Sequence, residues 1–123
     1  MQVVQNIGNY SAQNPSILTI GTFDGVHIGH QKIIKDLVKV AKKNNLCSIV
    51  LTFFPHPRMV LQKDSSIRLI DTLEEKQKIL ASLGIDILVI HPFSKEFSRL
   101  TPLEFTRDLL VNTFKISKVI IGY

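Results

Sequence analysis

The sequence has almost no cysteine and no long apolar run, and each shortage excludes a class of protein. Cys47 is the single cysteine among 123 residues, which excludes an internal disulfide framework and predicts a reducing compartment. No apolar run is long enough to span a bilayer, and the first residues lack the basic and then apolar segments of a secretory signal. We therefore expect a cytoplasmic protein without a membrane partner.

Basic residues exceed acidic ones, giving a net charge of +5. This charge agrees with an anionic partner but does not distinguish nucleic acid from nucleotides. The lysines of one predicted helix lie opposite its apolar face, with no aromatic residues among them: Lys32, Lys35, Lys39, Lys42 and Lys43. Such a pattern is typical of a solvated helix face, so we expect no nucleic-acid partner.

Short apolar runs alternate with amphipathic segments, which is the pattern of βαβ units. We expect strands at residues 3–4, 16–20, 46–54, 86–90 and 118–123. Helices are expected at about residues 30–43, 72–83 and 102–114. This order predicts an α/β fold with a parallel sheet and helices on both faces. With 45% hydrophobic residues, the chain of residues 1–123 suffices for one domain and is too short for two.

The second and third predicted helices each begin with a capping box. Thr72 precedes Glu75 by three residues, and Thr101 precedes Glu104 in the same way. In each pair the hydroxyl and the carboxylate can accept hydrogen bonds from each other's backbone N–H. Pro102 suits the first helical position, where no N–H is needed. These pairs predict where both helices start.

Residues 21–30, GTFDGVHIGH, join the first long apolar strand to the first helix. Gly21 and Gly25 permit backbone angles or close approaches that a Cβ would obstruct, and Gly29 lies where the helix opens. Free N–H groups and the helix dipole at that point attract an anion. Open parallel sheets also bind ligands at the carboxyl ends of their strands. The stretch is therefore a candidate phosphate site, although it matches neither the P-loop nor G-x-G-x-x-G.

Two histidines, His27 and His30, add imidazoles to this stretch. They could be metal ligands, acid/base groups, or donors to phosphate oxygens. A zinc site needs a third ligand, and His56, His91 and Cys47 lie in other segments without a typical spacing, so we assign no metal ligand. Donation to phosphate is favoured because glycines, dipole and imidazoles would then act on one anion.

The stretch GTFDGVHIGH resembles the signature of the nucleotidyltransferase superfamily with an H-x-G-H motif. Its full form is similar to the FMN adenylyltransferase module of the prokaryotic bifunctional riboflavin kinase/FAD synthetase family. Three further segments resemble that family in order and spacing: residues 52–57 (TFFPHP), 68–76 (RLIDTLEEK) and 95–105 (KEFSRLTPLEF). The resemblance covers roughly residues 17–123.

The resemblance implies a Rossmann-like nucleotidyltransferase domain that transfers AMP from ATP to FMN, giving FAD and pyrophosphate. The FMN phosphate would attack the α-phosphorus directly, so the protein's task is to align two anions and stabilise the crowded charge. Mg²⁺ would accompany the triphosphate. The partners expected are therefore small-molecule nucleotides and flavin, with a riboflavin kinase module fused in the natural protein and absent from this chain.

Site residues are carried over position by position. By resemblance His27 and His30 are the catalytic histidines that contact the ATP phosphates. The implied ATP-binding residues are Gly21, Thr22, Phe23, Asp24, Gly25, His27, Gly29 and His30. The loop after the second long strand would help to hold the flavin, through Phe54, His56, Pro57, Arg58 and Arg68. These loop residues also have ordinary interpretations, with Phe54 in the core and the arginines as surface charge.

The chain departs from the family at its end. Family members continue the last predicted strand into an Asp/Asn-Phe-Arg-Phe-Gly loop, whereas this sequence stops at Gly122 and Tyr123. The domain is therefore expected to be incomplete at its C-terminus, and the chain alone to be weakly active or inactive.

Two other functions stay open. Class I aminoacyl-tRNA synthetases also use His-Ile-Gly-His for ATP, but the short chain, the missing K-M-S-K-S and the upstream Phe-Asp-Gly-Val favour the flavin family. The other is a non-catalytic nucleotide-binding module.

Overall fold

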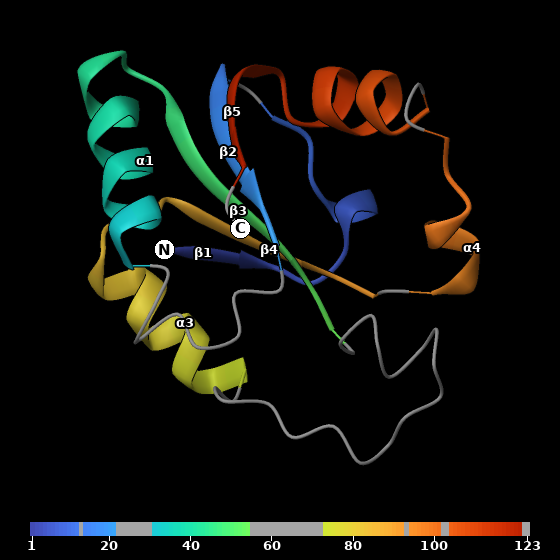
Figure 1. Ribbon diagram of the computed structural model, residues 1–123, viewed down its shortest axis with the longest axis horizontal. Helices are drawn as coiled ribbons and strands as arrows, with labels where there is room; N and C mark the ends of the chain where they lie inside the picture. The colour runs from blue at the N-terminus through green and yellow to red at the C-terminus, as the bar shows by residue number, and fades with distance from the viewer. Residues whose placement is uncertain (13, 22–30, 55–72, 93, 102–103, 122–123) are drawn as a thin grey trace.

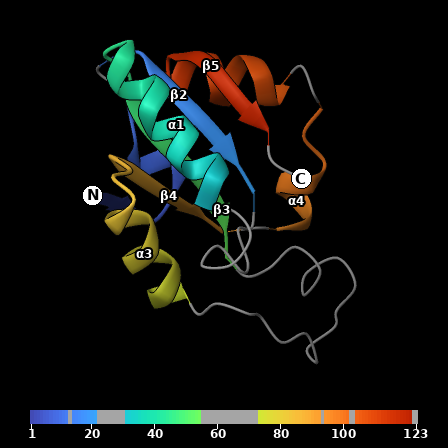
Figure 2. The ribbon, with the colours of Figure 1, turned by 60° about the vertical axis from the view of Figure 1, so that its left-hand side comes forward.

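The computed structural model describes residues 1–12, 14–21, 31–54, 73–92, 94–101 and 104–121. A central sheet lies between two layers of helices (Figures 1 and 2). The strands are β1 (Gln2–Val4), β2 (Ser16–Ile20), β3 (Cys47–Phe53), β4 (Ile87–His91) and β5 (Ile116–Ile121). The helices are α1 (Gln31–Lys43), α3 (Leu73–Ser82) and α4 (Lys95–Ser98), with a 3₁₀ turn η1 (Ile7–Asn9) and a π-helix η2 (Phe105–Thr113). The α/β prediction is confirmed.

All pairings in the sheet are parallel, and the strand order is β1-β4-β3-β2-β5. From β2 the chain steps to β3 and β4 on one side, and it then returns to place β5 on the other side of β2. The direction of winding therefore reverses at β2. In open sheets of this kind, such a switch point opens a crevice at the carboxyl ends of the strands.

Each face of the sheet buries its own core. On one face Ile17, Val50 and Leu88 pack against residues of α1 and α3. On the other, Leu18 and Leu51 pack with Phe114 and with side chains of η1, α4 and η2. Figures 1 and 2 agree on this division of the helices. Strands buried on both faces are nearly all apolar, which explains why they could be predicted from the sequence.

The ends of α1 and α3 share one hydrogen-bond pattern. After α1, Asn45 takes φ 53° and the Leu46 N–H donates to the Ala41 carbonyl at 2.8 Å. After α3, Gly84 takes φ 93° and the Ile85 N–H donates to Leu80 at 3.3 Å. These are Schellman motifs, in which a left-handed residue ends the helix. The Leu46 N–H is thus used to end α1 and cannot pair in the sheet, so β3 starts at Cys47 and not at residue 46.

Other boundaries also differ from prediction. The strand expected from residue 118 begins at Ile116, and Phe54 lies just past the end of β3. The third helix is a π-helix, and the short helix α4 was expected to be an irregular connection. The capping box predicted for the third helix is confirmed. The Thr101 N–H donates to Glu104 Oε1 at 3.2 Å, and the Glu104 N–H donates to Thr101 Oγ1 at 3.1 Å. Thr72 lies outside the described residues.

Candidate functional site

The carboxyl end of β2 carries the glycine and histidine stretch. Gly21 is half-buried, and its N–H donates to the Leu51 carbonyl at 3.1 Å, which extends the β2/β3 pairing one residue past β2. The stretch therefore begins at the switch point. The other predicted ATP-site residues lie outside the described part of the chain: Thr22, Phe23, Asp24, Gly25, His27, Gly29 and His30.

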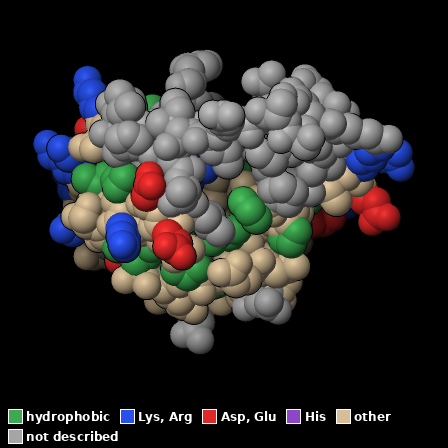
Figure 3. Space-filling model, turned by 90° about the horizontal axis from the view of Figure 1, so that it is seen from below, with side chains coloured by type: hydrophobic (Ala, Val, Ile, Leu, Met, Phe, Trp, Pro, Cys, Tyr) green, Lys and Arg blue, Asp and Glu red, His purple; other side chains and the backbone are tan. Residues whose placement is uncertain are grey.

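Helix α1 follows the stretch and begins at Gln31. Its buried side chains, Ile34, Leu37, Val38 and Ala41, hold it against the sheet. The five lysines of its other face are all exposed, as the sequence predicted. Figure 3 shows the molecule from below, with Lys and Arg in blue. Several of these basic side chains lie at its left edge, the side on which Figure 1 shows α1. The helix is thus anchored by its apolar face and opens near the carboxyl end of β2, where its dipole favours an anion.

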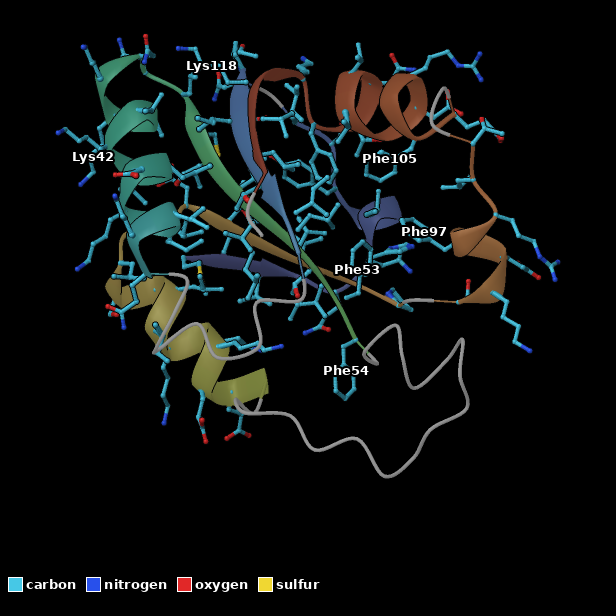
Figure 4. The ribbon with its side chains drawn as sticks, viewed as in Figure 1. Lys42, Phe53, Phe54, Phe97, Phe105 and Lys118 are labelled. Atoms are coloured by element: carbon cyan, nitrogen blue, oxygen red, sulfur yellow. The ribbon has the colours of Figure 1, made fainter. Side chains whose placement is uncertain are left out.

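The carboxyl end of β3 carries two phenylalanines with opposite environments. Phe53 is half-buried, and its ring lies 5.3 Å from that of Phe97 in α4. Phe54 is 49% exposed and lies below the end of the strand, away from that pair (Figure 4). The interpretation of Phe54 as a core residue is therefore wrong. The other predicted flavin residues, His56, Pro57, Arg58 and Arg68, lie outside the described residues.

His91 ends β4 and is held by two elements. Its Nδ1 accepts a hydrogen bond from the Ile7 N–H at 3.2 Å, and its ring lies 4.8 Å from the ring of Phe97. Burial lowers the pKa of His91 below its usual 6.5, which keeps the ring neutral and Nδ1 free to accept. The Phe97 ring also meets Phe105 edge-on at 6.4 Å. His91 thus has a structural role, beside an aromatic cluster that sequence reasoning missed.

Cys47 lies at the opposite end of β3 and is half-buried. Burial, together with the negative charge of Asp86, raises the pKa of its thiol. A protonated thiol is a poor nucleophile and a poor metal ligand. Among the described residues, no three or more His, Cys, Asp or Glu side chains are grouped so that they could hold a metal ion.

The sequence also gave no indication of one buried polar group, the hydroxyl of Thr19. Thr19 lies in β2 with none of its surface exposed, and its Oγ1 has no hydrogen-bond partner among the described residues. A threonine inside an apolar run is ordinary in a strand. The sequence therefore held no signal that this hydroxyl would be unpaired.

The chain was compared with known proteins. A family model described as FAD synthetase matches residues 9–123. A bifunctional riboflavin kinase/FMN adenylyltransferase of Buchnera aphidicola (from Schizaphis graminum) is 36% identical over 123 residues, which are 99% of this chain and 39% of that protein. The protein of the same description from Listeria monocytogenes is 37% identical over 108 residues, covering 87% of this chain and 34% of that one. The chain therefore spans about two fifths of the length of these relatives.

A solved structure shares the fold. It is described as a macrolide-efflux protein from Streptococcus pneumoniae, and it superposes with a TM-score of 0.84 at 26% identity. The match covers 98% of this chain and 40% of that one. That description names a different activity from the curated relatives, so the structure supports the fold and carries no argument about activity. None of the helices in the described ranges is long and apolar enough to cross a membrane.

Proposed function

The chain belongs to the FAD synthetase family, and from this premise we propose that it forms the ATP-binding part of an FMN adenylyltransferase. In the full-length protein it would transfer AMP from ATP to FMN, giving FAD and pyrophosphate. The observation that carries the proposal is the position of Gly21, which starts the GTFDGVHIGH stretch at the carboxyl end of β2, where the winding reverses. Such switch points bind nucleotides in open α/β sheets. The FMN adenylyltransferase activity named for the curated relatives supports the same reaction.

The proposed reaction is a direct displacement at the α-phosphorus of ATP. An FMN phosphate oxygen forms the new P–O bond, and the bond to the bridging oxygen breaks, so that its electron pair leaves with pyrophosphate. We propose that His27 and His30 donate hydrogen bonds to the phosphates and that Gly29 leaves room for them. The amino end of α1 adds its positive dipole. These groups would stabilise the charge that accumulates in the transition state.

Further ATP contacts are proposed for the rest of the turn, namely Gly21, Thr22, Phe23, Asp24 and Gly25. Mg²⁺, which prefers oxygen ligands, commonly binds through substrate phosphates with few protein ligands. The described residues offer no carboxylate cluster for it. We propose that it accompanies the triphosphate, where it would supply positive charge.

For the flavin we propose the segment that follows β3. Phe54 presents nearly half of its surface to solvent at the carboxyl end of the sheet, and an exposed ring there can stack on an isoalloxazine. His56, Pro57, Arg58 and Arg68 are proposed as further flavin contacts, in which an arginine would pair with the FMN phosphate. We also propose a fused riboflavin kinase module, as the relatives' description implies, and a cytoplasmic location, where a lone thiol stays reduced.

The experiment is a titration of the chain with ATP, FMN and FAD, repeated with a His27→Ala/His30→Ala double variant. Loss of two charge-assisted hydrogen bonds predicts ATP affinity at least about tenfold weaker. Lys42→Ala, which removes an exposed lysine at the far end of α1, is the matched control and should bind normally. Unchanged ATP binding by the double variant would refute the site. FAD formation from FMN, ATP and Mg²⁺ by the full-length protein, and none with CTP, tests the reaction.

A non-catalytic nucleotide-binding module would bind ATP and give no FAD in that assay. The class I aminoacyl-tRNA synthetase interpretation is not favoured, because the family model and the curated relatives all name flavin enzymes.

A further inference from the structure

The Thr19 hydroxyl is the one buried side-chain polar group without a hydrogen-bond partner among the described residues. Buried hydroxyls elsewhere in the sheet are paired. Ser16 Oγ donates to the Phe114 carbonyl at 2.6 Å, and Ser48 Oγ donates to Asp86 Oδ2 at 3.1 Å. Native proteins leave few buried polar atoms unpaired, and each one calls for an explanation.

Thr19 lies where a ligand could supply that explanation. It precedes Gly21 by two residues, at the carboxyl end of the strand at which the winding reverses. In the sheet it pairs with Val50 of β3 on one side and Ile120 of β5 on the other. Side chains alternate along a strand, so Thr19 shares the face of Ile17, which packs against α1. The hydroxyl is therefore on the side of the sheet covered by the helix that opens at the proposed nucleotide site.

An unpaired hydroxyl in this position is unfavourable for the free chain. Valine has the same shape, suits a strand equally well and carries no group that needs a partner. The hydroxyl therefore brings the free chain no benefit in the described structure. A ligand-bound state in which the hydroxyl finds a partner would account for its presence.

We propose that Thr19 is a positioning residue for ATP, whose hydroxyl gains its hydrogen-bond partner only in the nucleotide-bound state. Two independent observations support this: α1, a helix of 13 residues, covers the sheet face that Thr19 shares with Ile17, and the buried Thr19 hydroxyl has no partner among the described residues. The bond would fix the carboxyl end of β2, and hence Gly21, in the arrangement that holds the phosphates. This inference rests on the proposed function, because it needs ATP as the ligand.

The test compares hydroxyl removal with hydroxyl retention at one position, using the full chain. Thr19→Val removes the hydroxyl at constant shape, and Thr19→Ser keeps it. We expect Thr19→Val to melt at or above the wild-type temperature without ligand, yet to bind Mg·ATP about five- to tenfold more weakly in calorimetry, the loss of one hydrogen bond. Thr19→Ser should bind like the wild type. Ile17→Val, on the same face of β2, controls for a change in packing alone.

Each other outcome is decisive. Equal ATP affinity of Thr19→Val and the wild type overturns the inference. So does a lower melting temperature with unchanged ATP affinity, which would mean that the hydroxyl holds a buried water in the free chain. If Thr19→Val fails to fold, Thr19→Ser and Thr19→Ala provide a second pair that differs by the hydroxyl alone. Failure of the wild type to bind ATP would instead refute the proposed function, and it is seen without any variant.

Discussion

The two ends of the parallel sheet differ in how fully their polar groups are paired. At the amino end, Asp86 Oδ2 accepts hydrogen bonds from the Ser48 N–H at 2.9 Å and from Ser48 Oγ at 3.1 Å. The Asp86 N–H donates to Ser48 Oγ at 2.9 Å, and its carbonyl accepts from the Gln2 N–H at 2.9 Å. One aspartate thus joins β1, β3 and the start of β4. The amino end is closed by its own hydrogen bonds.

At the carboxyl end the pairing is less complete, although the Gly21 N–H and His91 Nδ1 are hydrogen-bonded there. Thr19 keeps an unpaired hydroxyl there, and Phe54 exposes almost half of its surface. Gly21 begins a stretch rich in glycine and histidine. Unsatisfied groups of this kind reduce stability and are retained where a ligand can use them. We infer that one end of the sheet maintains the fold and the other end is available for binding.

The largest effect on stability is predicted at the amino end of the sheet. There Phe114 is fully buried, and its carbonyl accepts a hydrogen bond from Ser16 Oγ. Phe114→Ala should lower the free energy of unfolding by about 3–5 kcal/mol, because it leaves a cavity in the core. Urea denaturation measures the change. Phe114→Leu, which keeps most of the volume, should cost much less. A loss below about 1 kcal/mol for the alanine variant would mean that this end is not the anchor of the fold.

A smaller loss is expected for Asp86→Ala, which leaves the Ser48 N–H and hydroxyl without their acceptor. We expect a decrease of about 1–3 kcal/mol in the free energy of unfolding. Ser48→Ala and the double variant complete a cycle, whose coupling energy should exceed about 0.5 kcal/mol because the two side chains share these bonds. Additive losses would show that Asp86 does not act through Ser48. ATP affinity should stay unchanged in all three variants.

The strands were predictable because their signals are local. The run at residues 16–20 is apolar and ends at Gly21, and Thr101 and Glu104 form the capping box that their spacing predicted. The π-helix η2 was not predictable, because apolar spacing does not separate i→i+5 from i→i+4 hydrogen bonding. The bond between Ser48 and Asp86 spans 38 residues and depends on strand order. Of the candidate site, the position of Gly21 just after the strand was predicted from the sequence. The exposure of Phe54 and the unpaired hydroxyl of Thr19 were not, because both depend on how the elements pack.

A still smaller effect should appear as a pH dependence caused by His91. Its folded-state pKa is lowered by burial, so the unfolded chain binds the proton more readily. The stabilising contribution of the neutral ring is complete above the unfolded pKa of about 6.5 and is lost as pH falls toward the folded pKa. Protonation at Nδ1 would also oppose the Ile7 N–H. Because the ring is only half-buried, we expect less than about 1 kcal/mol.

The measurement is the free energy of unfolding between pH 7.5 and 5.5, for the wild type and for His91→Gln, whose amide oxygen can still accept a hydrogen bond. The variant should lose less stability over this range. The two proteins differ only at residue 91, so the difference between their slopes reports on His91. Identical slopes would remove His91 as a pH-dependent contact.

The smallest effect on stability is predicted for Phe54→Ala, at the carboxyl end. An exposed side chain contributes little to the core, so the free energy of unfolding should change by less than about 0.5 kcal/mol. FMN affinity should nevertheless fall about two- to tenfold, the range expected for one lost aromatic contact. Phe54→Tyr keeps the ring and should restore binding. Val111→Ala removes an exposed apolar side chain from η2 and should change neither quantity.

Phe53 supplies the counterpart within the same dipeptide. Its ring packs on Phe97, so Phe53→Ala should lower stability where Phe54→Ala does not (Figure 4). At the end of β3, one phenylalanine would then contribute to stability and the next to FMN binding. If Phe54→Ala lowered stability as much as Phe53→Ala, or left FMN affinity unchanged, Phe54 would not be a flavin contact. Only the ATP-site residues Gly21 and Thr19 would then support the inference that the carboxyl end of the sheet binds ligands.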